Sequence, residues 1–235
     1  GGGGTCGLGF AVYPYGEQDY WGTSYSGWQT CRGFKQSPIN IQTKIANKVN
    51  AAQPLENNFG MSSEQTDYVN NNGHSLEVPG DFGSVMLDDL RYDSNQFHFH
   101  TPSEHQINGR GTEMEMHIVT KNAKTGTNAV VAIFLQVGTG RNDHNSCLEK
   151  VFKSPAPKAG CDKPVGTIDL SCFEPQLKGS WWSYDGSLTT PPCTEGVKWM
   201  VMKETATISK AQFDVFQTRF TVNARKPQEV YNRAV

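Results

Sequence analysis

Residues 96–105 read Gln-Phe-His-Phe-His-Thr-Pro-Ser-Glu-His, and the first five of them alternate between polar and aromatic side chains. Successive side chains of a β-strand leave opposite faces, so Phe97 and Phe99 share one face of the predicted strand. His98 and His100 then share the other face. The stretch therefore predicts a β-strand that carries two neighbouring imidazoles on one side.

The rest of the chain is also predicted to be rich in β-strands. Its apolar runs are short, β-branched or aromatic, and they are separated by Gly, Pro, Asn and Asp, which is typical of strands joined by turns. The run 130–137 is continuous enough to be a central strand. Besides 97–100, the expected strands are 114–119, 130–137 and 197–202.

Helical periodicity is weak by comparison. Residues 145–152 have room for two turns, and 209–220 spaces three phenylalanines as a helix would, with Ser209 as a suitable N-cap. No repeat or linker divides the chain. We therefore expect one β-dominated domain over residues 1–235, in which 1–12 form an irregular N-terminal arm.

The composition excludes two classes of function. Lys and Arg number 21 and Asp and Glu 23 in 235 residues, a formal net charge of −2, so no basic field is present to hold a nucleic-acid backbone. The longest apolar run, 129–135, is about a third of the roughly 20 residues that a transmembrane helix needs. We expect neither a nucleic-acid partner nor a membrane span.

Histidines are concentrated in one part of the chain: four of the six lie between 98 and 117. His117 belongs to another strand-like run, 17 residues after His100, and Asn-Gly-Arg-Gly at 108–111 allows the chain to return. Two imidazoles from one strand and a third from its neighbour form three corners of a tetrahedron. The fourth corner stays open for water, as in catalytic zinc sites.

Two further side chains are placed to orient these imidazoles. Gln96 precedes His98 by two residues and Glu115 precedes His117 by two, so each shares a strand face with its histidine. Zinc-bound imidazoles generally donate their second N–H to such oxygen atoms. On these residues alone, the alternative that the histidines are ordinary inward polar residues of a barrel or sandwich stays open.

Five motifs together point to a known family. They are Gln36-Ser-Pro-Ile-Asn-Ile41, Asn71-Asn-Gly-His74, Gln96-Phe-His-Phe-His-Thr-Pro-Ser-Glu-His105, Glu115-Met-His117 and Ser187-Leu-Thr-Thr-Pro-Pro192. With them the chain resembles an α-class carbonic anhydrase from about Tyr13 to Arg233, and Thr-Pro-Ser-Glu after His-x-His is closer to algal, plant and bacterial members. The resemblance implies a mainly β (α+β) fold with a large central, mostly antiparallel twisted sheet and a few short peripheral helices.

The resemblance also implies an activity, that of a carbonic anhydrase, which is a lyase. One Zn²⁺ per chain on His98, His100 and His117 would carry a hydroxide that reversibly converts CO₂ to bicarbonate and a proton. Thr189 would accept a hydrogen bond from that hydroxide and donate its own to Glu104, which aims the nucleophile. Sulfonamides or anions are the expected inhibitors. The family's substrate pocket corresponds to Val119, Val130, Leu188, Thr190 and Trp199.

A proton shuttle is implied in the same way. His74 matches the family's shuttle position, and an ordinary histidine pKa near ~6.5 suits proton transfer to buffer. Tyr15, Asn72 and Glu77 match positions that organise the water path. Glu77 replaces the asparagine or glutamine common in the family, and we expect this carboxylate to raise the pKa of His74.

The six cysteines contain no Cys-x-x-Cys, which argues against a thiolate zinc site. Their even number is compatible with three disulfides and also with reduced thiols. In secreted and lumenal relatives the positions of Cys31 and Cys193 are joined. This expectation places the protein outside the cell or in another oxidising compartment, such as a periplasm or a thylakoid lumen.

The remaining four cysteines allow three connectivities. Of these we favour a local Cys147–Cys161 bond together with a Cys6–Cys172 tether of the N-terminal arm. Four free thiols are the alternative.

Some positions depart from the family's animal members, and two other functions compete. Tyr13 replaces a tryptophan and Thr120 a histidine, whereas His105 is expected to be structural and His144 exposed in a loop.

A non-catalytic binding or storage relative is one alternative, although such proteins typically lose a zinc histidine. A different zinc hydrolase, such as an esterase, is the other; the narrow apolar pocket disfavours peptide substrates.

Overall fold

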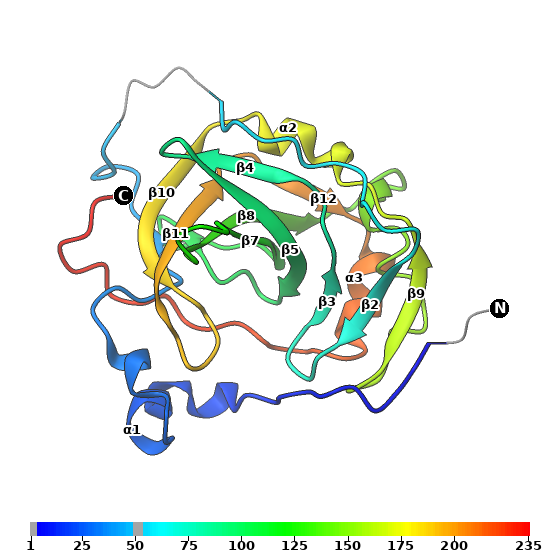
Figure 1. The fold of residues 1–235 in the computed structure, drawn as a ribbon, viewed down its shortest axis with the longest axis horizontal. Coiled ribbons are helices and arrows are strands. Elements are labelled where there is room, and N and C mark those ends of the chain that lie inside the picture. The colour runs from blue at the N-terminus through cyan, green and yellow to red at the C-terminus, as the bar shows by residue number, and fades with distance from the viewer. Residues whose placement is uncertain (1–3, 49–53) are drawn as a thin grey trace.

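A ten-stranded twisted β-sheet forms the body of the molecule (Figure 1). The computed structural model describes residues 4–48 and 54–235. Eight strands of this sheet follow one another in the order β10-β11-β8-β7-β5-β3-β2-β9, while β12 pairs with β8 and β4 with β5. These strands are β2 (Asp67–Asn71), β3 (Leu76–Pro79), β4 (Ser84–Leu87), β5 (Leu90–His100), β7 (Met114–Lys121), β8 (Asn128–Val137), β9 (Asp162–Gly166), β10 (Trp181–Ser187), β11 (Glu195–Met202) and β12 (Ala206–Ile208).

Most neighbouring strands of this sheet are antiparallel, and the exceptions are β11 and β12, which both run parallel to β8. A separate two-stranded parallel sheet joins β1 (Asn40–Ile41) to β6 (Gln106–Ile107). The four strands predicted from sequence are confirmed, each within a longer observed strand. The run 130–137 is central as expected, because β8 pairs with β7, β11 and β12.

The helices are short and peripheral. They are η1 (Tyr15–Tyr20), α1 (Trp21–Ser24), η2 (Gln29–Arg32), η3 (Ser146–Leu148), η4 (Ser171–Phe173), α2 (Glu174–Leu177) and α3 (Lys210–Gln217). Among the described residues, none is long and apolar enough to cross a membrane. Ser209 caps α3 as predicted, in a reciprocal capping box with Gln212.

The helix predicted over 145–152 is wrong in extent. Only the single turn η3 forms there, capped by the Asn145 side chain, which accepts from the Leu148 N–H at 3.2 Å. This N–H is one of the first backbone donors of the turn, which have no partner within a helix and are satisfied by a capping side chain. Cys147 and Leu148 are buried at this turn, so packing into the core replaces helix propagation.

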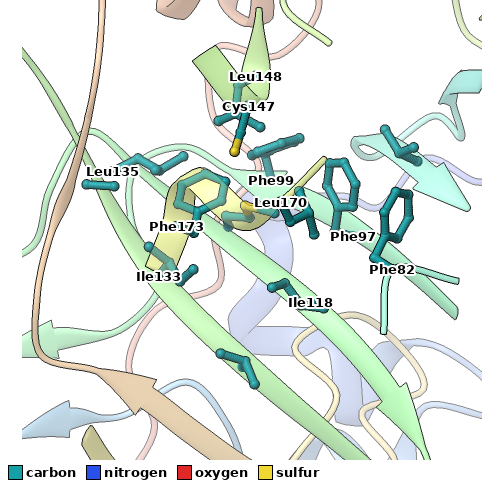
Figure 2. Close-up of a cluster of buried hydrophobic side chains, with 14 of the residues drawn as sticks. Phe82, Phe97, Phe99, Ile118, Ile133, Leu135, Cys147, Leu148, Leu170 and Phe173 are labelled. Carbon is teal, nitrogen blue, oxygen red and sulfur yellow. The ribbon is translucent and has the colours of Figure 1, made fainter. Parts of the chain in front are cut away.

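The larger hydrophobic core lies on one face of the sheet. Phe97 and Phe99 of β5 are fully buried in it, and their rings meet edge to face at 5.9 Å. Figure 2 shows these rings gathered with Ile118 of β7 and with Leu170 and Phe173. Burial of each such side chain contributes about 1.5–3 kcal/mol, so the aromatic half of the alternating stretch anchors β5.

The opposite face of the sheet carries a smaller cluster around β8, β10 and β11. Its buried members include Val130, Tyr184 and Trp199, and Val119 and Leu188 pack against it. A third cluster consists of Trp21, Cys31 and Cys193, and it packs the first helical turns against the loop before β11. The histidine face of β5 therefore looks toward the smaller cluster.

Three disulfides connect all six cysteines. Cys31 is bonded to Cys193, 162 residues later, which ties η2 to the loop before β11. The preferred pairing of the other four is wrong, because the bonds are Cys6–Cys161 and Cys147–Cys172.

The physical reason lies in where the four cysteines stand. Cys161 directly precedes the edge strand β9, where Cys6 of the arm pairs with it as an isolated antiparallel bridge. Cys147 lies in η3 and meets Cys172, an exposed residue of η4. The preference for Cys147–Cys161 was based on nearness in sequence. The observed pairing follows instead from the packing of η3 against η4.

The predicted N-terminal arm, 1–12, forms no helix or strand over 4–12 and makes one isolated bridge, at Cys6. Its residues 1–3 lie outside the described part of the chain.

We predict that Cys31→Ser with Cys193→Ser lowers Tm by roughly 5–15 °C, because the lost link closes a loop whose entropy is about 5 kcal/mol at most. Thermal unfolding by circular dichroism without reductant measures this. With strong reductant present, wild type and variant should melt together. Equal Tm values without reductant would contradict a stabilising bond.

Candidate metal centre

The pairing of β5 with β7 brings three histidines together. His98 and His117 are direct cross-strand partners, and His100 follows two residues along the same face. Their ring centroids lie 4.7 to 5.3 Å apart. One ring nitrogen from each lies within 4.8 Å of the other two, so the three imidazoles converge on one point.

Each imidazole has one nitrogen engaged on the outer side. His98 Nδ1 donates to Gln96 Oε1 at 2.6 Å, and His100 Nδ1 donates to the Asn223 carbonyl at 2.8 Å. His117 is held through Nε2 by the Glu115 carboxylate. The outer hydrogen bond fixes the tautomer of each ring. The nitrogens that face the centre are therefore Nε2 of His98, Nε2 of His100 and Nδ1 of His117.

The inner nitrogens form a cluster that could hold a metal ion. His98 Nε2 and His100 Nε2 are 3.1 Å apart, and in this tautomer both present lone pairs. Burial lowers the pKa of all three rings, that of His98 well below its usual range and that of His100 to about 4. At neutral pH the rings are uncharged, the form that binds metal ions.

Glu115 links the centre to the protein behind it. Its carboxylate accepts from His105 Nδ1 at 2.8 Å and from the His105 backbone N–H at 2.8 Å, besides His117. Burial alone would raise the pKa of Glu115, but His105 and His117 outweigh it and the net direction is downward. His105 is thus buried and structural, as expected, and it continues the network to the Tyr184 hydroxyl at 2.6 Å.

Glu104 lies beside the centre with one oxygen held and one free. Its Oε1 accepts from the Arg225 backbone N–H at 2.9 Å, whereas Oε2 has no hydrogen-bond partner within the described chain and lies 3.9 Å from His117 Nδ1. Burial raises the pKa of Glu104 to about 7, and the nearby Thr189 hydroxyl acts to lower it. A buried oxygen of this kind requires a donor.

Thr189 and Thr190 belong to the loop between β10 and β11. The Leu188 N–H donates to the Thr194 carbonyl and the Cys193 N–H to the Thr190 carbonyl, both at 2.9 Å, so the loop folds back on itself. Thr189 is buried and Thr190 half-buried.

The apolar side chains predicted to line a pocket belong to one cluster. Val119 pairs with Val130 across β7 and β8, and Val130 pairs with Trp199 across β8 and β11. The Trp199 ring lies 4.9 Å from that of His117. Leu188 packs against the same cluster, so an uncharged wall adjoins the histidines.

His74 lies in the β2–β3 turn, where its Nδ1 contacts the Ala11 carbonyl at 2.9 Å. Asn72 caps this turn by accepting from the His74 N–H, and its amide donates to Glu77. Tyr15 packs against Trp21, with its buried hydroxyl unpartnered among the described residues. Its pKa is raised, mainly by burial and further by the charge of Glu104.

The expected effect of Glu77 on His74 is wrong. The pKa of His74 is lowered, because burial outweighs its hydrogen bonds to the Ala11 and Asn72 backbone. Glu77 is the cross-strand partner of His98 and its carboxylate is bound by Asn72. Burial raises the pKa of Glu77, and its hydrogen bond with Asn72 acts in the opposite direction.

Two framework residues were not predicted from sequence. Asn223 accepts from His100 through its carbonyl, and its amide donates to the carbonyls of His74 and Phe99. The buried Arg225 side chain donates to Gln36 Oε1 and to two backbone carbonyls. Both follow α3 in an irregular segment, where neither strand nor helix periodicity marks a residue as important. His144, by contrast, is exposed in a loop as predicted.

Fold and site together define a β-sheet protein with a three-histidine centre, and comparison with known proteins places it in a family. The family model described as eukaryotic-type carbonic anhydrase matches residues 16–235. A carbonic anhydrase from Klebsiella pneumoniae is 33% identical over 94% of this chain and 87% of its own length, and alpha carbonic anhydrase 3 from Arabidopsis thaliana 32% identical over 92% and 78%.

A solved structure agrees with these relatives. The alpha-carbonic anhydrase from Thermovibrio ammonificans, determined with the inhibitor sulfanilamide, superposes with a TM-score of 0.82 at 33% identity, covering 98% of this chain and 99% of that one. The chain belongs to the eukaryotic-type (α) carbonic anhydrase family.

We predict that Arg225→Met destabilises the fold by about 3 kcal/mol or more, since it leaves three buried acceptors without donors, which corresponds to a Tm decrease of roughly 6–12 °C. Differential scanning calorimetry measures the change. Arg91→Met is the matched control, because its ion pair with Asp93 is exposed and worth at most about 1 kcal/mol. Equal effects of both substitutions would refute the role given to Arg225.

Proposed function

We propose that this chain catalyses the zinc-dependent, reversible hydration of CO₂ to bicarbonate and a proton. The observation that carries the proposal is the set of three inward ring nitrogens, each on an imidazole whose second nitrogen is held by the protein. Family membership supports the same activity.

The donor set suits Zn²⁺. Three neutral imidazoles without a fourth protein ligand form the ligand set of catalytic zinc sites, whereas structural sites use four. Two facing lone pairs 3.1 Å apart repel one another unless a cation lies between them. When bound, zinc supplies a coordinated water acidic enough to act as a nucleophile near neutral pH.

Thr189 and Glu104 are the residues we assign to orienting that nucleophile. Glu104 Oε2 is buried and free to accept the Thr189 hydroxyl proton. With that proton engaged, the Thr189 oxygen can only accept, which selects one orientation of the attacking group. A cation on the neighbouring histidines would lower the pKa of Glu104 and so favour the accepting carboxylate.

The uncharged wall beside His117 suits CO₂. Val119, Val130, Leu188 and Trp199 offer no charged group, and CO₂ has neither charge nor a strong hydrogen-bonding group. We assign Thr190, which lies on the same loop as Thr189, to the edge of this pocket. A charged or peptide substrate would lose hydration there without compensation, which also disfavours a peptidase. Sulfonamides are the expected inhibitors.

We assign the proton transfer to His74. Its Nδ1 donates to Ala11, so Nε2 is the nitrogen that accepts a proton. Burial keeps its pKa below the usual value, and the ring is neutral and ready to accept at pH 7. Tyr15, Asn72 and Glu77 would border the water path between His74 and the centre.

Three disulfides within the described chain support maturation in an oxidising compartment. We therefore keep the extracellular space, a periplasm and a thylakoid lumen as the proposed locations.

We predict about one zinc per chain in the wild type and its loss in His98→Ala, together with loss of CO₂ hydration, since two imidazoles do not hold a catalytic ion. Elemental analysis and stopped-flow hydration with and without a sulfonamide measure both. His144→Ala, which removes an exposed histidine, is the control and should keep metal and activity. Folded wild type that is active without zinc would refute the proposal.

We predict that His74→Ala slows turnover roughly tenfold or more in weak buffer, because proton transfer then lacks its acceptor. Free imidazole added to the assay should restore the rate. The ratio kcat/KM should stay unchanged, since it reports CO₂ conversion and not proton release. An unaffected weak-buffer rate, or a loss that imidazole leaves unrepaired, would remove His74 from this role.

A further inference from the structure

We propose that the N-terminal arm, residues 4–12, is a positioning element for His74 and that the Cys6–Cys161 disulfide holds it there. The group in contact is the main-chain carbonyl of Ala11, which accepts from His74 Nδ1 at 2.9 Å. The inference rests on the proposed function insofar as His74 is taken to transfer protons.

The first half of the arm is fixed to the edge of the sheet. In Figure 1 the blue N-terminal segment passes along the outside of the molecule, below β2 and β3, on its way to α1. The Thr5 hydroxyl and backbone hydrogen-bond Asp162, and the Gly7 and Leu8 N–H groups both donate to the Gly160 carbonyl at 3.0 Å. The Cys6–Cys161 bond lies between these contacts.

The second half of the arm lies directly on the His74 turn. Ala11 donates its N–H to the Asn72 carbonyl at 2.9 Å and accepts from the His74 ring, so both backbone groups of one residue face the turn. Gly73 has φ +90°, and a Cβ there would come within 2.6 Å of the Ala11 carbonyl oxygen. Only glycine therefore permits this close approach.

The arm has little hydrophobic attachment of its own. Leu8, Phe10 and Val12 are 37%, 57% and 69% exposed, so burial contributes little to holding it. A chain end with few buried contacts is poorly ordered unless it is tied down. The disulfide, five residues before Ala11, is the covalent tie on this segment.

The consequence for His74 is a fixed tautomer and ring orientation. An acceptor at Nδ1 places the ring hydrogen there and leaves Nε2 with its lone pair exposed for a proton. The Tyr13 ring, at the end of the arm, lies 4.7 Å from the His74 ring and limits its rotation. Ala11 thus acts through His74 without touching any reacting atom.

The direct test is the tautomer of His74 in full-length protein. Proteins labelled with ¹⁵N-histidine are compared by long-range ¹H–¹⁵N NMR, and His74→Ala identifies the signals. We expect the Nδ1–H tautomer in the wild type and a shift toward Nε2–H in Cys6→Ser with Cys161→Ser. The matched control, Cys147→Ser with Cys172→Ser, removes a disulfide remote from the arm and should keep Nδ1–H.

A second variant covers the case in which the double substitution does not fold. Phe10→Ala keeps all three disulfides but removes the ring that a Cβ at Gly73 or Gly160 would meet at 2.9 Å. It should shift the tautomer in the same direction. An Nε2–H wild type, or unchanged Nδ1–H in both arm variants, overturns the proposal.

Kinetic measurements on the same variants separate this proposal from the proposed function. Release of the arm should lower kcat in weak buffer roughly threefold or more, leave kcat/KM unchanged and be rescued by imidazole. A shifted tautomer with unchanged kcat overturns the catalytic significance of the arm. If His74→Ala itself leaves weak-buffer kcat intact, the proposed shuttle fails, while the NMR result still decides whether the arm positions the ring.

Discussion

The antiparallel register of β5 on β7 is the constraint on which the rest of the site depends. It sets His98 opposite His117 and His100 opposite Glu115, so one pairing places the three imidazoles of the candidate centre and the carboxylate that holds one of them. The register is held because Phe97 and Phe99 are buried on the other face, and a shift by one residue would exchange the two faces. Hydrophobic packing on one side thereby fixes polar geometry on the other.

Around this pairing, the tautomer of each imidazole is set by its hydrogen-bond partner on the outer side. Gln96, Glu115 and the Asn223 carbonyl determine which nitrogen is free, and burial keeps the rings neutral. Glu115 is in turn held by two hydrogen bonds from His105, so the partner of His117 is itself fixed by the protein. Preorganisation of this kind lowers the cost of binding an ion in a single geometry.

The parts that could be predicted from sequence are those whose signal is local. Alternation in 96–100 and the short spacing to His117 predicted β5 and β7, the five motifs shared with a known family were needed to single out the histidine triad, and Ser209 marked the start of α3. Asn223 and Arg225 could not be found in this way, because their contacts join segments more than a hundred residues apart. The same holds for Cys6 with Cys161, which are 155 residues apart, and the helical pattern of 145–152 gave only the short turn η3.

The distribution of contacts along the chain also has a kinetic meaning. The hairpin of β5 and β7 joins residues about 20 positions apart, whereas β11 joins β8 across 69 residues and Arg225 joins Gln36 across 189. Loop closure of this length is slow compared with local pairing. All three imidazoles and the carboxylates of Glu104 and Glu115 therefore belong to one local segment of the chain, and only the hydroxyl of Thr189 depends on pairing between distant segments.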